Sequence, residues 1–261
     1  MFKRTRVTER IEAVIKITER CNINCTYCYM FNRGNNDYEQ HPVYISDETI
    51  AATSQFLAHG AQFYGTKEVR IIFHGGEPMM FKKARFTAMC ELFIREITPH
   101  AKLVFAMQTN GMLVTDEWIA ILSQYKIGVG VSIDGPKDCH DAQRVDHQGH
   151  GTYDRAVAGL KKLQMAHEEG RIFPPGGICV IDATQDARKI YHHLVNELGI
   201  KKQNFLIPMD THDSIAPQAA DKLGDFLIQI FDAWTKADDP TIDVRVITQA
   251  MRFFMNGKRC G

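Results

Sequence analysis

Three cysteines on one short stretch of chain constrain this protein more than any other feature. Cys21, Cys25 and Cys28 follow an apolar, strand-like run at 13–17 with the spacing C-x3-C-x2-C. Three converging thiolates suit a [4Fe–4S] cluster, which normally takes four cysteine ligands. With only three cysteines nearby, one iron is left open to bind another molecule. The spacing therefore indicates a cluster at which chemistry takes place.

Structural zinc is the main alternative to a cluster at these cysteines. Zinc takes four ligands in tetrahedral geometry, usually from paired C-x2-C knuckles. The chain has no second knuckle, although a distant histidine could supply a fourth ligand, so a zinc-bound, non-catalytic module stays open. A disulfide framework is not expected, because the seven cysteines are an odd number and no secretory segment is present.

Length and composition agree with a soluble enzyme. A chain of 261 residues with 44% hydrophobic side chains can bury one barrel-sized core. The 31 basic and 31 acidic side chains balance, which gives no electrostatic footprint for nucleic acid or a membrane surface. No stretch approaches the length of a transmembrane helix. We expect no nucleic-acid or membrane partner and a cytoplasmic, reducing location, which suits unpaired cysteines.

The chain alternates strand and helix signals. Amphipathic helical patterns, clearest at 86–97 and 223–234, lie between the apolar runs, and Ser46 and Thr115 are typical helix starts. The apolar runs are at 14–17, 69–73, 103–107, 127–133, 177–181 and 204–207. Alternating units of this kind predict an α/β fold with a parallel sheet, here a partial TIM-like (β/α)6 barrel.

The unusual residues fall where these strands end. The cysteine loop follows the first strand, and His-Gly-Gly-Glu-Pro at 74–78 follows the second. Gln-Thr-Asn-Gly at 108–111 follows the third, and Ser-Ile-Asp-Gly-Pro at 132–136 follows the fourth. Each segment alone is also ordinary turn punctuation. Because parallel barrels carry their chemistry on these loops, the series predicts an active site at the C-terminal ends of the strands.

The cysteine segment resembles the radical S-adenosylmethionine (SAM) superfamily, whose signature is C-x3-C-x-Φ-C with an aromatic Φ, here Tyr27. The resemblance implies a [4Fe–4S] cluster held by the three cysteines, with SAM chelating the fourth iron. Electron transfer into the sulfonium then releases a 5′-deoxyadenosyl radical. Such chemistry belongs to the cofactor, while the protein binds and orients it.

The same resemblance implies a set of SAM contacts. Glycines lack a Cβ and let a ligand approach the backbone, and Glu77 is expected to pair with the SAM ammonium or to brace the loop. An arginine presents donors matched to a carboxylate, although Arg144 near Asp141 and Asp146 is also consistent with a surface ion pair. The predicted cofactor-binding residues are Tyr27, Gly75, Gly76, Glu77, Asn110, Ser132, Arg144 and Ile178. The neighbours of Ile178 in the fifth strand are alternative candidates for contacting the adenine of SAM.

Substrate-side residues are less constrained. Asp210 and His212 follow the sixth strand at the barrel mouth, where they would touch substrate or move a proton. Capping of the following helix explains the nearby Asp213 equally well. We take Asp210 and His212 as the candidate catalytic residues.

The full motif set resembles the radical SAM enzymes that carry a SPASM or twitch extension and modify peptides and proteins. The sequence around the cysteines is most similar to maturases that build three-residue cyclophanes in ribosomally made precursor peptides. Sulfatase-type formylglycine maturases and radical SAM enzymes that act on small molecules are the alternatives. The expected partners are a peptide or protein substrate and an electron donor such as flavodoxin or ferredoxin. We expect a core barrel at 1–215 and a helical segment at 216–261. This segment would lead to an extension that is truncated or missing, because Cys260 is its only cysteine.

Overall fold

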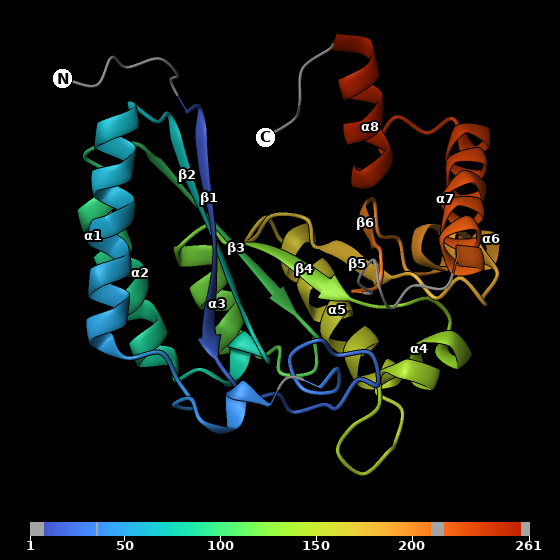
Figure 1. Ribbon diagram of the computed structural model, residues 1–261, viewed down its shortest axis with the longest axis horizontal. Coiled ribbons are helices and arrows are strands. Elements are labelled where there is room, and N and C mark those ends of the chain that lie inside the picture. The colour runs from blue at the N-terminus through green and yellow to red at the C-terminus, as the bar shows by residue number, and fades with distance from the viewer. Residues whose placement is uncertain (1–7, 35, 210–216, 257–261) are drawn as a thin grey trace.

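The computed structural model describes residues 8–34, 36–209 and 217–256, and it alternates strands with helices as the sequence predicts (Figure 1). The strands are β1 (Arg10–Thr18), β2 (Glu68–Gly75), β3 (Lys102–Thr109), β4 (Gly128–Ser132), β5 (Gly176–Val180), β6 (Lys202–Leu206) and β7 (Asp243–Val244). The α-helices are α1 (Asp47–Tyr64), α2 (Lys83–Ile97), α3 (Asp116–Gln124), α4 (Lys137–Gln143), α5 (Tyr153–Glu168), α6 (Ala187–His192), α7 (Pro217–Ala237) and α8 (Arg245–Asn256). Short turns complete the set: 3-10 turns η1 (Asp37–Glu39) and η2 (Pro78–Met80), and the π-helical turn η3 (His193–Glu197).

All strand pairs are parallel, and the sheet runs in chain order from β1 to β7. Ile15 lies beside Phe73, and Phe73 lies beside Met107, so the apolar runs stand in register. The carboxyl ends of the strands therefore meet at one edge. The predicted α/β partial barrel is confirmed; β7 is a seventh strand that the sequence reading missed, because two residues carry no detectable alternation.

The hydrophobic core lies between the sheet and the helices on its outer side. In β2 every second residue is buried, and α2 presents its predicted apolar stripe to the same layer. Phe73 packs on Phe86 and Phe105, and Phe86 packs on Trp118, which joins β2, β3, α2 and α3. The opposite face of β1 stays open, as the 59% exposure of Val14 shows.

Helix starts follow the predicted caps. The Ser46 hydroxyl accepts a hydrogen bond from the Thr49 backbone N–H at 3.1 Å and begins α1. The Thr115 hydroxyl accepts one from the Trp118 backbone N–H at 3.3 Å and begins α3. These bonds satisfy helix N–H groups that have no partner within the helix. Both expected helix starts are confirmed.

The segment after β6 continues the same sheet. Phe226 of α7 packs on Phe205 of β6, and Val244 of β7 pairs with Gln203 of β6. The boundary at residue 215 remains a prediction, and Cys260 lies outside the described residues. In the part of the chain that the structure describes, every helix is too short or too polar to cross a bilayer.

Candidate active site

The cysteine loop is held in place from two sides. It leaves β1 at the edge where the strands end (Figure 1). On one side the backbone N–H groups of Asn24 and Thr26 donate to the carbonyls of Val145 and Gln143, at 2.7 and 2.9 Å. On the other side the Glu77 N–H donates to the carbonyl of Arg20 at 2.9 Å. The loop is therefore fixed by main-chain bonds that do not depend on a bound group.

Within the loop, local hydrogen bonds bring the cysteines round one turn. The Cys28 N–H donates to the Cys25 carbonyl at 3.0 Å, and the Asn32 side-chain amide donates to the same carbonyl at 2.8 Å. The Asn32 N–H donates to the Cys28 carbonyl at 2.8 Å. Asn32 thus closes the loop just beyond the last cysteine.

The three thiols face a cavity of ≈ 470 Å³ at the carboxyl ends of the strands. Burial raises the pKa of Cys21 to about 12, and burial likewise raises that of Cys25, although Arg144 opposes the rise there. A bound cation removes such protons, since a coordinating thiol is deprotonated. Without a bound group the site therefore holds Cys21 and Cys25 as protonated thiols, and a cluster must displace these protons when it binds.

Two polar side chains approach the cysteine sulfurs. The Asn110 amide nitrogen lies 3.9 Å from Sγ of Cys21, and Nη1 of Arg144 lies 3.6 Å from Sγ of Cys25. Among the described residues no three His, Cys, Asp or Glu side chains surround one point as they would around a single ion. A [4Fe–4S] cluster has no such requirement, because it takes each ligand at a separate iron.

Six of the eight predicted cofactor residues line this cavity with the three cysteines. They are Tyr27, Gly75, Gly76, Asn110, Ser132 and Arg144. Glu77 lies behind the cavity wall, and Ile178 does not line it. Because β5 alternates, Val180, two residues beyond Ile178 and nearer the strand end, takes the lining position instead. The Ile178 side chain fills the space beside Gly130 on the neighbouring strand, where a Cβ on Gly130 would lie 2.8 Å from Cδ1 of Ile178.

Gly75 and Gly76 are needed for a reason that the sequence did not show. A Cβ on Gly76 would lie 2.0 Å from the carbonyl oxygen of Arg20. A Cβ on Gly75, whose φ is +133°, would lie 2.3 Å from the carbonyl oxygen of Thr18. The space of both missing side chains is filled by the backbone that leads into the cysteine loop. The two glycines therefore let that loop pack directly on β2.

Glu77 braces the loops. Its fully buried carboxylate accepts hydrogen bonds from the Met79 N–H at 3.0 Å, the Thr109 hydroxyl at 2.7 Å and the Asn110 N–H at 2.8 Å. Burial raises the pKa of Glu77, and these hydrogen bonds oppose the rise. Of the two roles left open for Glu77, these contacts match the brace.

Changing Glu77 to glutamine is expected to lower the free energy of unfolding by about 2 kcal/mol. The glutamine oxygen can still accept from Met79 and Thr109, but its amide group then faces the buried Asn110 N–H as donor against donor. Urea denaturation of the metal-free protein measures the loss. Glu91→Gln is the matched control, since that exposed carboxylate accepts one bond, from the Tyr125 hydroxyl. Equal effects of both changes would contradict the brace.

Asn110 connects the third strand end to the cysteine loop. Its side-chain amide donates to the Asn22 side-chain oxygen at 2.8 Å, and its own side-chain oxygen accepts from the Met112 N–H at 3.0 Å.

His74, on β2, accepts a hydrogen bond from the Gly75 N–H at 2.8 Å, and burial lowers its pKa. His74 thus satisfies a strand-end backbone group while also lining the cavity.

Arg144 is not a surface arginine. It is 7% exposed, and its Nε donates to Oδ2 of Asp134 at 2.9 Å. Asp146 instead pairs with Arg155. The alternative of a surface ion pair with Asp141 or Asp146 is therefore wrong, because the chain after α4 turns Arg144 inward. Asp134 was missed as a site residue, although it belongs to the Ser-Ile-Asp-Gly-Pro segment that the sequence singled out.

A neutral histidine holds the loop of Asp134. Nδ1 of His140 accepts from the Asp134 N–H at 3.4 Å, and Nε2 lies 3.1 Å from the Thr152 hydroxyl. That hydroxyl donates to the carbonyl of Arg144 at 2.8 Å. Nε2 is therefore the protonated nitrogen. Burial, and then the charge of Arg144, lower the pKa of His140 to about 4.

Stability should consequently fall as the pH drops from about 6.5 to about 4. Above pH 6.5 His140 is neutral in both the folded and the unfolded chain. Between pH 6.5 and about pH 4, the unfolded chain binds a proton at His140 that the folded chain does not. The expected contribution is about 3 kcal/mol. Urea denaturation over this pH range should give a flatter curve for His140→Gln than for the parent, whereas exposed His150→Gln should keep the parent slope. An unchanged slope in His140→Gln would contradict the assignment.

The candidate catalytic residues Asp210 and His212, with Asp213, lie outside the described residues. The described part of the rim reaches Met209, which lines the cavity with Leu206 and Pro208. The sequence left Val180 open only as a neighbour of Ile178, and Leu206 and Asn22 were not assigned to the site. The sequence signal for the first two was their position at strand ends, where parallel sheets carry ligands.

The donor set fits a cluster with SAM. Three thiols share one cavity with Ser132, whose side chain carries a hydroxyl and which is 5% exposed. The Arg144 guanidinium lies at the same wall. A cluster ligated by the thiols would leave the hydroxyl, the guanidinium and the glycine backbone for a charged small molecule.

Comparison with known proteins agrees with this chemistry. A family profile described as "Radical SAM superfamily" matches residues 15–177, more than half of the chain. The chain is 27% identical over 224 residues to a cysteine-type anaerobic sulfatase-maturating enzyme of Clostridium perfringens, covering 82% of this chain and 57% of that protein. It is 26% identical over 224 residues to the serine-type enzyme of Klebsiella aerogenes, covering 84% of this chain and 52% of that protein.

A solved structure shares the fold. It is described as native anSMEcpe with bound AdoMet and Kp18Cys peptide. It is 23% identical, has a TM-score of 0.78, and the match covers 97% of this chain and 68% of that one. The chain thus spans little more than half the length of the curated relatives named above.

Proposed function

The chain belongs to the radical SAM superfamily, and we propose that it uses this chemistry to take hydrogen from a peptide or protein substrate. Its cofactors are a [4Fe–4S] cluster and SAM, as in the family. Reductive cleavage of SAM at such a cluster supplies a 5′-deoxyadenosyl radical that abstracts hydrogen. The observation that carries the proposal is the meeting of three cysteine thiols, the Gly75–Gly76 backbone and the Ser132–Arg144 wall in one cavity.

In the proposed arrangement each cavity residue has one task. Cys21, Cys25 and Cys28 ligate the cluster. The Gly76 backbone receives the SAM amino group, and Ser132 and Arg144 receive its carboxylate. The Tyr27 backbone and Val180 lie against adenine, with Val180 in place of Ile178. Four apolar side chains of the cavity lining, Met30, Phe31, Leu206 and Met209, would limit the access of water to the reacting atoms.

The peptide substrate is supported by the relatives. Two relatives are sulfatase-maturating enzymes, and a solved neighbour was obtained with a bound peptide. The resemblance of the cysteine segment to cyclophane maturases favours a carbon–carbon crosslink in a ribosomally made precursor; oxidation of a cysteine or serine to formylglycine is the alternative that the named relatives favour. We propose a flavodoxin or ferredoxin as electron donor.

The cofactor half of the proposal is tested without substrate. The protein is reconstituted anaerobically with iron and sulfide and incubated with SAM and dithionite. We expect about four irons per chain and release of 5′-deoxyadenosine and methionine. One zinc per chain and no product would instead support the zinc-bound module.

The substrate half is tested by co-expression with a candidate short precursor peptide, followed by mass spectrometry. A crosslink would remove two hydrogens from the peptide: one as an atom taken by the 5′-deoxyadenosyl radical, and one as a proton whose electron would return to the oxidised cluster. Oxidation of serine to formylglycine also removes two, so an aldehyde-reactive hydrazide must be included. A peptide that has lost two hydrogens and does not react with the hydrazide supports the crosslink. A labelled peptide supports formylglycine, and an unmodified peptide contradicts peptide modification.

A further inference from the structure

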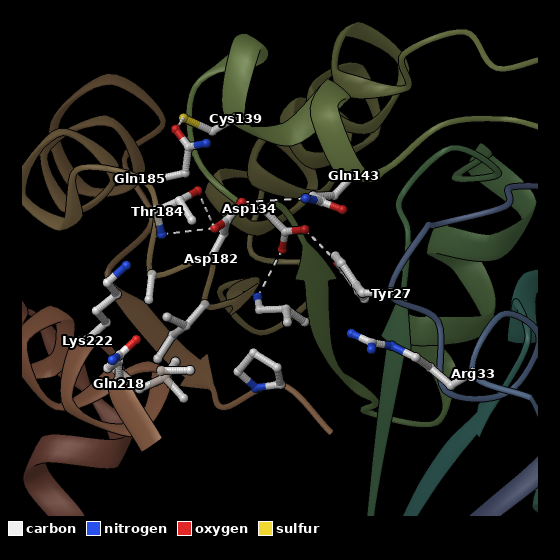
Figure 2. Close-up of a pocket in the computed structure, with 16 residues that line it drawn as sticks. Tyr27, Arg33, Asp134, Cys139, Gln143, Asp182, Thr184, Gln185, Gln218 and Lys222 are labelled. Carbon is white, nitrogen blue, oxygen red and sulfur yellow. Dashed lines mark hydrogen bonds between the residues drawn. The ribbon is translucent and has the colours of Figure 1, made fainter. Parts of the chain in front are cut away.

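Asp134 is a buried carboxylate with an unusual set of partners. It is 5% exposed and lies two residues beyond the end of β4. Its Oδ2 accepts from Nε of Arg144 at 2.9 Å and from the Tyr27 hydroxyl at 2.5 Å. Its Oδ1 accepts from the Val180 N–H at 3.0 Å. Figure 2 shows the side chains of Asp134 and Tyr27 pointing toward one another.

These partners come from three separate parts of the site. Tyr27 lies between the cysteines Cys25 and Cys28 in the cluster loop, Val180 ends β5, and Arg144 follows α4. One carboxylate therefore joins the cluster loop to the strand ends on the far side of the cavity. A carboxylate can do this because it accepts several bonds at once and carries the charge that a buried guanidinium requires.

Asp134 also lies at the wall between two cavities. A second cavity of ≈ 390 Å³ shares Tyr27, Val180 and Pro208 with the cofactor cavity. Asp134 lines the second cavity, whereas Arg144 lines the first. The carboxylate thus holds the guanidinium from behind, through Nε, while Nη1 lies 3.6 Å from Sγ of Cys25.

The Tyr27 ring completes the same support. The Arg144 guanidinium carbon lies 5.6 Å from the centre of that ring, within cation–π range. The hydrogen bond from the Tyr27 hydroxyl to Asp134 holds the outer end of that ring in place. Three groups therefore hold one another: the carboxylate orients the guanidinium, and both orient the aromatic side chain between two cluster ligands.

We propose that Asp134 is a positioning residue for SAM, which it never contacts and on which it acts by fixing Arg144. Without the carboxylate, Arg144 keeps its charge but loses the bond that sets its orientation. The inference rests on the proposed contact between Arg144 and SAM, and it is independent of which substrate is modified.

The test is a double-mutant cycle on SAM affinity. The reconstituted protein, without peptide or reductant, is dialysed against radiolabelled SAM, and Kd is normalised to the iron-loaded fraction. Asp134→Asn should raise Kd about tenfold, the scale of one charge-assisted hydrogen bond. Arg144→Met should raise it at least as much. The double variant should match Arg144→Met alone, because Asp134 acts only through the arginine.

Other outcomes distinguish the proposed positioning role of Asp134 from a purely structural one. A parent-like Kd in Asp134→Asn, or equal and additive losses in both backgrounds, overturns the proposal. Should Asp134→Asn fail to load iron, Asp134→Glu keeps the charge but moves it by one methylene. Its Kd should rise severalfold at parent iron content, and a parent-like Kd again overturns the proposal.

The matched control is Asp182→Asn. Asp182 follows β5, lines the second cavity and accepts bonds from Thr184, but it has no recorded contact with Arg144. Its Kd for SAM should stay within about twofold of the parent, inside the usual effect of a remote polar change. Because peptide is absent from the assay, a parent that binds SAM but modifies no peptide would refute the proposed function and leave this inference intact.

Discussion

Replacing Cys25 by alanine is expected to abolish 5′-deoxyadenosine formation and to lower iron content sharply. Cys25 is buried at the centre of the loop and is one of the three thiols that line the cavity among the described residues. A cluster that already lacks a fourth cysteine ligand would be left with two. Changes to residues that merely support a metal ligand cost about 10–100-fold, so loss of a ligand should exceed a hundredfold. Iron analysis and product quantification on the reconstituted protein measure both effects.

Cys90→Ala is the matched control for this change. Cys90 is fully buried in α2 and packs in the hydrophobic core, away from the cavity. Burial raises the pKa of its thiol, and its removal leaves a small void worth about 1 kcal/mol. Iron content and product should both match the parent. Full product formation by Cys25→Ala, or equal loss in Cys90→Ala, would contradict the assignment of the cluster to the loop.

The fold was predictable because its signals are local and repeated. Apolar runs separated by amphipathic stretches predict parallel strands, and parallel strands align their carboxyl ends. The sequence alone therefore predicts the cysteine loop, Gly75–Gly76 and Ser132 at one rim of the sheet. β7 was not predicted, because its two residues, Asp243 and Val244, are too few to show a strand-like alternation of polar and apolar side chains.

The contacts within the site were less predictable, because they depend on burial and register. Arg144 and Asp134 are ten positions apart, and nothing in that spacing shows that both turn inward to form a buried pair. Likewise, whether Ile178 or Val180 reaches the cavity depends on how far β5 extends beside β4. A resemblance identifies the type of site, whereas these pairings require the packed structure.

The role of the glycine pair illustrates the same limit, and it leads to the second large effect. Gly76→Ala should weaken the docking of the cysteine loop, because the new Cβ would lie 2.0 Å from the Arg20 carbonyl oxygen and 2.9 Å from the Cys21 nitrogen. Both are backbone atoms, so no side-chain rotation relieves the overlap. The loop must move, which breaks the 2.9 Å bond from the Glu77 N–H to the Arg20 carbonyl.

We expect Gly76→Ala to lower the free energy of unfolding by about 1–3 kcal/mol, the usual cost of overpacking, and to reduce iron loading severalfold. Urea denaturation of the metal-free protein and iron per chain after reconstitution measure the two effects. Gly60→Ala, within α1, is the control. A Cβ on Gly60 would lie 3.7 Å from the side chain of Ile11, an ordinary van der Waals contact. That change should stabilise the protein by up to about 1 kcal/mol through helix propensity. If Gly76→Ala kept parent stability yet failed to bind SAM, the glycine would serve ligand access alone and not loop docking.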